Sequence, residues 1–235
     1  MDTQTRHALK NDKFAQATAS SVSWVSGHRS GVVRVVIAAV VLLALVIGAI
    51  VFYNVRSSAA DSALGGALDV YDAALATPGA PAETGVYSTA ADRSRAANKQ
   101  FLQAAQQYSW LPEGKKAHYF AGITYEELGQ TASAEAELKL AADSWDSNLA
   151  NLAKVALASL YHQTARDSQA IDLYNQVIAK PSRTVSAGQA QLDLAALYAA
   201  TGKQDQARAL WAKVKDADKD GAAGSIATQK LNAKQ

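Results

Sequence analysis

A repeated pattern around three tyrosines is the feature that most constrains the fold of this chain. The segments "ITYEELGQTASAEAEL", "ASLYHQTARDSQAIDLY" and "AALYAATGKQDQARALW" align when Tyr125, Tyr161 and Tyr198 are superimposed, and these tyrosines lie 36 and 37 residues apart. A fixed period of this length predicts a repeat architecture. Because a hairpin of two short helices cannot bury its apolar face alone, neighbouring copies must stack to form a continuous core.

Each copy contains small and bulky apolar residues at helical spacing. In the first helices these residues are Ala121, Gly122, Tyr125 and Leu128, then Leu157, Ala158 and Tyr161, then Leu194, Ala195 and Tyr198. In the second helices they are Ala134, Leu138 and Ala141, then Ala170, Tyr174 and Val177, then Ala207, Trp211 and Val214. Gly129 and Gly202 end first helices, and Pro181 ends a second helix. The sequence has no convincing strand pattern, so we predict an all-α stack of helical hairpins.

The spacing of these residues resembles the tetratricopeptide repeat (TPR). The small residues, aromatic residue, glycine and bulky residue of that family are matched in the first copy by Gly122, Tyr125, Gly129, Ala134, Leu138 and Ala141. The resemblance covers about residues 97–219 and implies a TPR-like α-helical hairpin solenoid. It departs at the position often occupied by Trp, where the chain has His118, Lys154 and Gln191, and at Ala165, which replaces the glycine of the other copies.

In TPR stacks the first helices line a concave groove, so the resemblance also implies a set of partner-binding residues. The transferred positions are Lys116, Tyr119, Ile123, Glu126, Glu127, Leu152, Val155, Ser159, His162, Gln163, Gln189, Leu192 and Ala196, followed by Ala199 and Ala200. This face is mixed and mildly apolar, and it suits an extended or helical peptide. The alternative is that these are ordinary solvent-facing residues.

An apolar run from Val35 to Tyr53 contains 19 residues without a charge. As a helix it spans roughly 29 Å, which fits the hydrocarbon core of a membrane. Arg34 and Arg56 bracket the run, so their charges can reach the interfaces. A preceding tail of 34 residues and the length of the run favour an uncleaved span over a signal peptide. A cleaved signal and a buried core helix are the alternatives.

Charge predicts the orientation of this span. The tail carries five Lys and Arg residues against two Asp, whereas Asp61, Asp69 and Asp72 follow the span. The positive-inside rule therefore places the amino terminus in the cytoplasm and the rest outside, which in a Gram-negative bacterium is the periplasm. Beyond Arg56 the chain has 17 Lys and Arg against 19 Asp and Glu, a net charge of −2. Without a basic stripe, we expect no nucleic-acid partner.

The pattern divides the chain into four parts. These are a cytoplasmic tail (1–34), a transmembrane helix (35–55), a membrane-proximal helix and loop (56–90), and a TPR-like domain with a carboxy-terminal capping helix (91–235). In the third part we expect a helix over 58–76, with Gly65 and Gly66 as a weak point. Thr89 with Asp92 predicts a capped helix start, and Pro112 suits the first turn of a helix.

Residues that carry chemistry are sparse. The four histidines, His7, His28, His118 and His162, show no metal-ligand spacing, and no nucleophile elbow or Gly-rich phosphate loop is found. The segment Asp216 to Gly221 places carboxylates as a calcium loop does, but Ala227 stands where the bidentate Glu belongs. This segment is either a solvated turn or a low-affinity cation site. We expect no enzyme, no cofactor and no resident metal.

The order of tail, span and TPR-like stack resembles the bacterial ancillary subunit of the Sec translocon. That resemblance implies an anchored protein beside the channel that acts with periplasmic chaperones on emerging chains. The segments "FLQAAQQYSWLPEGKKAHYFAGITYEELG" and "DKDGAAGSIATQKLNA" also resemble the periplasmic cell-division coordinator of the Tol–Pal system, a family that implies a cleaved signal and a coiled coil. We therefore expect a non-enzymatic scaffold or adaptor at the Sec translocon of the bacterial inner membrane. The alternative is an envelope scaffold in cell division or outer-membrane assembly.

Overall fold

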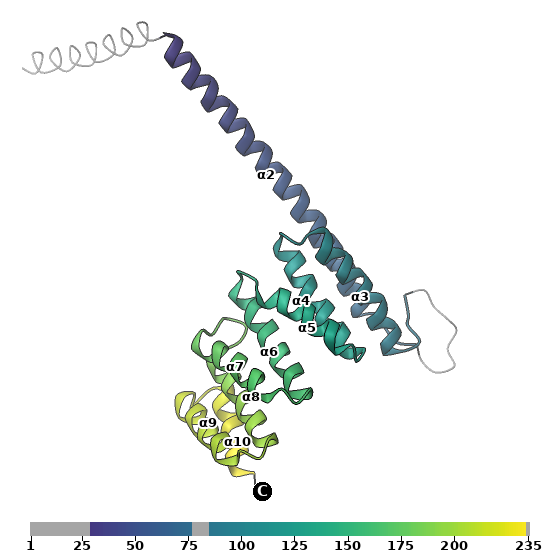
Figure 1. Cartoon of the computed structure of the whole chain (residues 1–235), viewed down its shortest axis with the longest axis vertical. Coiled ribbons are helices and arrows are strands. Elements are labelled where there is room, and N and C mark those ends of the chain that lie inside the picture. The colour runs from purple at the N-terminus through teal and green to yellow at the C-terminus, as the bar shows by residue number, and fades with distance from the viewer. Residues whose placement is uncertain (1–28, 77–84, 234–235) are drawn as a thin grey trace, which may run out of the picture. The chain divides into compact units, whose positions relative to one another are not determined.

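The computed structural model describes residues 29–76 and 85–233, and these residues form nine α-helices and no β-strand. Figure 1 shows the helices in chain order. They are α2 (Arg29–Tyr71), α3 (Ala90–Gln107), α4 (Pro112–Glu127), α5 (Thr131–Ala142), α6 (Ser147–Gln163), α7 (Asp167–Ala179), α8 (Ala187–Ala200), α9 (Gln204–Ala217) and α10 (Ala222–Asn232). An isolated bridge pairs Leu75 with Tyr87 between α2 and α3. The all-α prediction is confirmed.

Helix α2 contains the predicted span and is the helix long and apolar enough to cross a membrane within the described residues. Its most apolar window has a mean hydropathy of 3.3, and none of that window is buried. The chain divides into two compact units, residues 1–56 and residues 57–235. The predicted cytoplasmic tail falls almost entirely on residues 1–28, which lie outside the described part of the chain.

Beyond Arg56 the same helix α2 belongs to the repeat unit. Leu64 and Ala67 are buried in a cluster with Ala97 and Phe101 of α3. The sequence predicted a helix over 58–76, and the helix ends at Tyr71. Gly65 and Gly66 do not interrupt it, since contact with α3 holds this segment in place. The compact unit that contains the repeats thus begins at residue 57 and includes this last part of α2.

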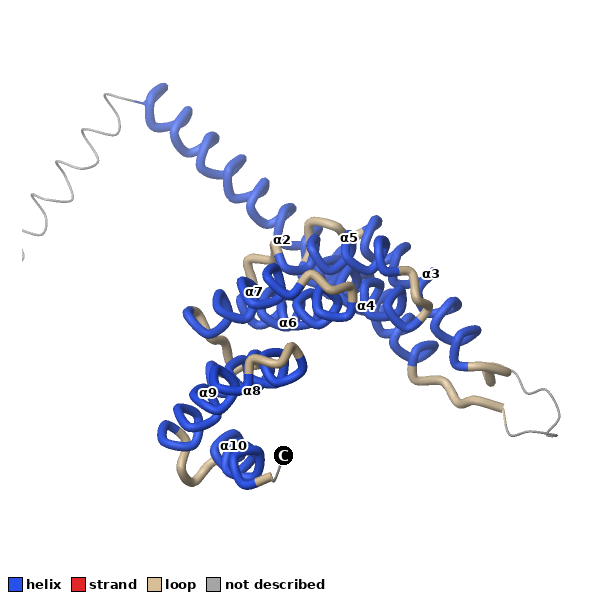
Figure 2. The backbone as a smooth tube through the Cα atoms, turned by 60° about the horizontal axis from the view of Figure 1, so that its bottom comes forward, coloured by secondary structure: helices blue, strands red, loops and turns tan. Residues whose placement is uncertain are grey.

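Successive helices pack as antiparallel neighbours, each against the next, from α3 to α10 (Figure 2). The pairs α4 with α5, α6 with α7 and α8 with α9 are the three predicted repeats, and α10 packs on α9 and α8. One buried cluster runs through four of these helices and contains Ala134, Leu138, Leu157, Ala158, Leu160, Tyr161, Ala170, Tyr174, Leu194 and Leu197. Small residues bring the helices close: a Cβ built on Gly122 would lie 2.6 Å from Leu138 Cγ.

Side chains cap the starts of α3 and α8, and the first of these caps is the one predicted at Thr89. The Thr89 hydroxyl accepts a hydrogen bond from the Asp92 N–H at 3.1 Å, and the Ser186 hydroxyl accepts one from the Gln189 N–H at 3.1 Å. Pro112 is the first residue of α4, where its missing N–H leaves no bond unmade. These local signals position the start of α3, α4 and α8.

The three aligned tyrosines occupy one structural position, near the end of the first helix of each repeat. Their carbonyls accept the closing bond of a Schellman motif, at 2.8 Å in every case. The donors are the N–H groups of Gln130 to Tyr125, Arg166 to Tyr161 and Lys203 to Tyr198. The residue directly before each donor turns the chain and has a positive φ. This angle is 71° at Gly129, 57° at Ala165 and 78° at Gly202. Ala165 therefore holds a left-handed conformation with a side chain attached.

Replacing Ala165 by Gly should stabilise the protein by about 0.5–1 kcal/mol, because a left-handed Cβ costs about 1–2 kcal/mol and the greater freedom of Gly in the unfolded chain offsets part of the gain. Urea unfolding of the full chain in detergent micelles measures the change. The matched substitution Gly202→Ala should lower stability by a similar amount. A loss of stability in Ala165→Gly would contradict the strain assigned to this turn.

Replacing Ala170 by Leu should lower the free energy of unfolding by about 1–3 kcal/mol, because overpacking a close helix contact forces neighbouring side chains to shift. Ala170 is fully buried in the cluster shared by α5 to α8. Ala209→Leu, on an exposed position of α9, is the control and should change stability by less than about 0.5 kcal/mol. Equal melting curves for the two variants would remove this packing account.

Candidate functional site: the face of the first helices

The predicted groove residues lie on α4, α6 and α8, the first helices of the three repeats. Helices α4 and α6 touch directly, and a hydrogen bond of 2.7 Å from Gln163 Nε2 to Glu126 Oε1 joins two of the predicted residues. Gln163 also lies 3.4 Å from the Ser159 hydroxyl on its own helix. The structure therefore places these groove positions of neighbouring repeats side by side.

A cavity of about 300 Å³ opens between α6 and α8, with α7 behind it. It is lined by Ser159, His162, Tyr174, Asp193, Ala196, Leu197 and Ala200. Ser159, His162, Ala196 and Ala200 were assigned to the groove from sequence, and the fold brings these four to one place. The cavity is our candidate site.

Asp193 is the charged group of the cavity that sequence reasoning missed. Its carboxylate is half-buried and accepts a hydrogen bond from Gln189 Nε2 at 2.9 Å. Burial raises the pKa of Asp193, and the bond from Gln189 opposes that rise. A signal was present in the sequence, because Asp193 lies four residues after Gln189 and three before Ala196, on one helical face.

Two further groups set the polarity of the cavity. The Tyr174 side chain is buried, and burial together with the charge of Asp193 raises its pKa to about 12, so the phenol is neutral at physiological pH. His162 Nδ1 lies 2.6 Å from Asp167 Oδ1 at the start of α7. The imidazole is thereby held at the rim of the cavity by a carboxylate of the following helix.

Other predicted groove residues take part in packing. Leu192 is 6% exposed in a cluster with Ala195, Ala207 and Trp211, so it belongs to the core and cannot contact a partner. The sequence placed it in the groove, but α9 and α10 cover this side of α8. Partly buried side chains at the edge of the core are Tyr119, Ile123, Leu152 and Val155.

Glu127, also assigned to the groove, holds the first three helices of the repeat unit together. Its carboxylate accepts hydrogen bonds from the Tyr71 hydroxyl and from the Ser94 hydroxyl, both at 2.5 Å. Tyr71 ends α2, Ser94 lies on α3 and Glu127 ends α4. Lys116, near the other end of α4, lies 3.9 Å from Glu113. These contacts fix the beginning of the face on which Tyr119 and Ile123 lie.

An ion-pair network joins the first repeat to the second. Glu135 on α5 lies 2.7 Å from both Lys139 Nζ and Arg166 Nη1, and it accepts a hydrogen bond from the Tyr161 hydroxyl at 3.1 Å. The bond from Lys139, followed by those from Arg166 and Tyr161, lowers the pKa of Glu135 to about 2. The Arg166 guanidinium also stacks 4.2 Å above the Tyr161 ring. The network keeps α5 against the turn between α6 and α7, and so fixes the angle between the two repeats.

The remaining polar clusters have structural partners. His118 Nδ1 lies 2.6 Å from Glu137 Oε2, linking α4 to α5. Asp218, in the segment that resembles a calcium loop, accepts a hydrogen bond from the Gly224 N–H at 3.1 Å and so binds the first turn of α10. In the described part of the chain no three His, Asp or Glu side chains gather into a metal-binding group. The carboxylate of Asp218 is thus committed to a helix start.

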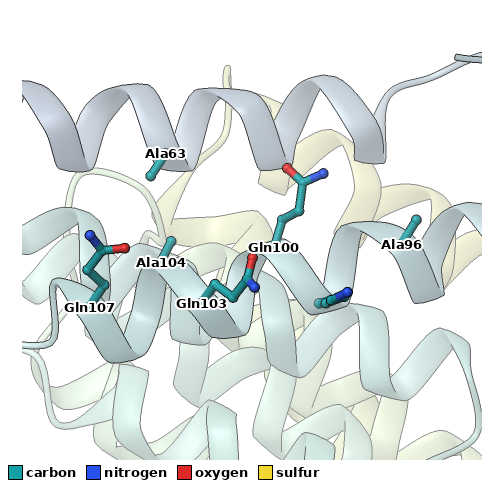
Figure 3. Close-up of a pocket in the computed structure, with 7 residues that line it drawn as sticks. Ala63, Ala96, Gln100, Gln103, Ala104 and Gln107 are labelled. Carbon is teal, nitrogen blue, oxygen red and sulfur yellow. The ribbon is translucent and has the colours of Figure 1, made fainter.

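A larger hollow of about 510 Å³ lies between α2 and α3, away from the predicted groove. Figure 3 shows Ala63 of α2 facing Ala104 of α3, with amide side chains around them. The lining residues are Ala63, Ala96, Lys99, Gln100, Gln103, Ala104 and Gln107. These side chains offer amides, methyl groups and the ammonium of Lys99, and they lack the carboxylate that distinguishes the cavity between α6 and α8.

Comparison with known proteins adds a likeness of fold. No protein-family model matches this chain, and no curated protein sequence matches it. One similar solved structure is a single-substitution variant of nearly identical TPR-like repeats from a protein of Podosopora anserina described as a "putative kinesin light chain". It has a TM-score of 0.44 and 19% sequence identity, and the match covers 60% of this chain and 71% of that chain. The unsubstituted repeats give 0.43 and 17%, covering 61% and 72%. What the present chain binds must be argued from its own residues.

Replacing Asp193 by Asn should raise the free energy of unfolding at pH 7 by about 0.3–1 kcal/mol, because a half-buried carboxylate without a cation destabilises the folded state. The raised pKa sets the sign with pH: the folded wild type takes up a proton more readily than the unfolded chain, so the gain should shrink as pH falls through that pKa. Urea unfolding at a series of pH values measures both effects. The exposed Asp172→Asn on α7 is the control, and a wild type more stable than Asp193→Asn at pH 7 would contradict this assignment.

Proposed function

We propose that this chain is a membrane-anchored scaffold that holds a segment of another protein on the face of α4, α6 and α8. The observation that carries the proposal is the cavity between α6 and α8, where groove residues of two repeats converge on one opening. Stacked repeats offer an extended surface that recognises a peptide through many small contacts. The contacts of the described side chains are core packing, helix caps and ion pairs, which hold the repeats in a fixed arrangement as a scaffold requires.

An anchor makes weak binding by such a surface sufficient. A helix that fixes the protein in a membrane confines its binding face to the neighbourhood of other membrane proteins. The effective concentration of a partner in the same membrane then replaces high intrinsic affinity. The half-buried side chains on the face of α4, α6 and α8 fit such weak binding, because each has little further surface to bury against a partner.

We further propose that the anchor lies in the bacterial inner membrane, with the repeats in the periplasm beside the Sec translocon. The excess of Lys and Arg before the span and the aspartates after it support this orientation. The partners would be translocon subunits, a periplasmic chaperone or emerging client chains, and the order of tail, span and repeats supports that setting. An envelope scaffold for division or outer-membrane assembly is the alternative with the same architecture.

Photo-crosslinking in living cells from two positions tests the proposal. A photoreactive residue at Leu45, exposed in the span, reports membrane neighbours, and one at Ala196, exposed in the cavity, reports what the face holds. Ala209, exposed on α9 outside the cavity, is the matched control. We expect channel subunits from Leu45, with a chaperone or exported chains from Ala196 and far less from Ala209.

The other outcomes each remove one part of the proposal. If both positions capture division or outer-membrane assembly proteins and no channel subunit, the envelope scaffold would be the supported function. Equal capture from Ala196 and Ala209 would mean that the cavity is not the binding face. Protection of the repeats from external protease in spheroplasts, with cleavage only after lysis, would show the inverted topology.

A further inference from the structure

The charge of the cavity between α6 and α8 indicates which kind of segment it holds, an inference that rests on the proposed function. Asp193 from α8, His162 from α6 and Tyr174 from α7 are the ionisable groups that line it, and Asp167 is already paired with His162. Tyr174 is neutral, and no Lys or Arg is among the lining residues. The cavity therefore presents a carboxylate that no Lys or Arg of its own wall neutralises, and its one imidazole is bonded to Asp167.

Asp193 has an amide as its hydrogen-bond partner where a cation would be expected. Gln189 Nε2 occupies one carboxylate oxygen at 2.9 Å, and among the described residues no Lys or Arg lies within ion-pair distance of it. Glu135 is the contrasting case in the same fold, since two cations and a hydroxyl surround its carboxylate. A carboxylate removed from water is normally paired. Asp193 therefore lacks the cation that would normally accompany such a carboxylate, and a bound ligand could supply it.

The walls of the cavity suit the stem of a long side chain. Ala196, Leu197 and Ala200 contribute apolar surface from α8, next to the carboxylate, while Ser159 and His162 form the opposite rim from α6. A volume of about 300 Å³ is at the small end of the range for ligand pockets, which fits one side chain better than a folded element. Lys and Arg combine a methylene stem with a terminal cation, so they match both features.

We propose that this cavity binds a Lys or Arg side chain of a peptide lying on the face of α4, α6 and α8, with the cation at the Asp193 carboxylate. An acidic side chain would be repelled there, and an apolar one would bury the carboxylate without a partner. The carboxylate of Glu126, further along the same face, adds to the attraction for a basic segment. The partner class is therefore a basic peptide segment.

A selection from a random dodecapeptide phage library tests the proposal, with the full-length chain immobilised in detergent micelles. Wild type, Asp193→Asn and the exposed control Asp172→Asn are selected in parallel. We expect Lys and Arg to be enriched in peptides bound to wild type and to Asp172→Asn, and this enrichment to be lost with Asp193→Asn. A wild-type binder should lose about tenfold or more in affinity for Asp193→Asn, as expected for a charge-assisted bond.

A second variant keeps the test decisive if Asp193→Asn is poorly folded. Ala196→Lys adds an internal cation beside Asp193 at an exposed position, and it should exclude basic peptides in the same way. Enrichment of Lys and Arg that persists in both variants would overturn the proposal, as would wild-type binders without such enrichment. If the selected peptides bind all variants equally well, the proposed groove would stand and the proposed cation pocket would be wrong. The absence of any binder would overturn the groove as well.

Discussion

No helical hairpin in this chain can bury its apolar surface without a neighbour, and the rest of the structure depends on that constraint. The central cluster takes residues from α5, α6, α7 and α8, so it belongs to no single repeat. Ala134 and Leu138 supply one side, and Leu194 and Leu197 the other. Once the helices are stacked in this way, the first helix of every repeat must appear on the same face. The proposed binding surface is thus a consequence of how the core is closed.

The same constraint explains how the repeat unit begins. Helix α3 has an apolar side that no complete repeat covers, and the last part of α2 covers it through Leu64 and Ala67. Glu127 completes this arrangement by bonding Tyr71 and Ser94 across three helices. Because α2 is one continuous helix from Arg29 to Tyr71, the element that carries the apolar span also supplies part of the core.

Features encoded by local chemistry could be predicted from the sequence, whereas features that depend on neighbouring helices could not. The aligned tyrosines and the glycines after them gave the helix ends, because a Schellman turn needs a left-handed residue at a fixed place. Leu192 was misplaced because periodicity identifies a face of α8 but not how far α9 and α10 wrap around it. Asp193 was missed because the groove positions taken from the TPR resemblance do not include it. It lines the cavity because a gap between α6 and α8 leaves its side chain accessible there.

The carboxylates of Asp193 and Glu135 lie in opposite environments within one fold. Glu135 is surrounded by cations, its pKa is lowered, and its charge stabilises the folded state above the unfolded pKa. Asp193 is half-buried without a cation, its pKa is raised, and its charge opposes folding at neutral pH. A sequence selected for stability alone would replace such a group, since a neutral residue of similar shape fits the same position. In the proposed complex the cation of a bound segment would pair with Asp193, and the stability lost at this carboxylate would then contribute to binding.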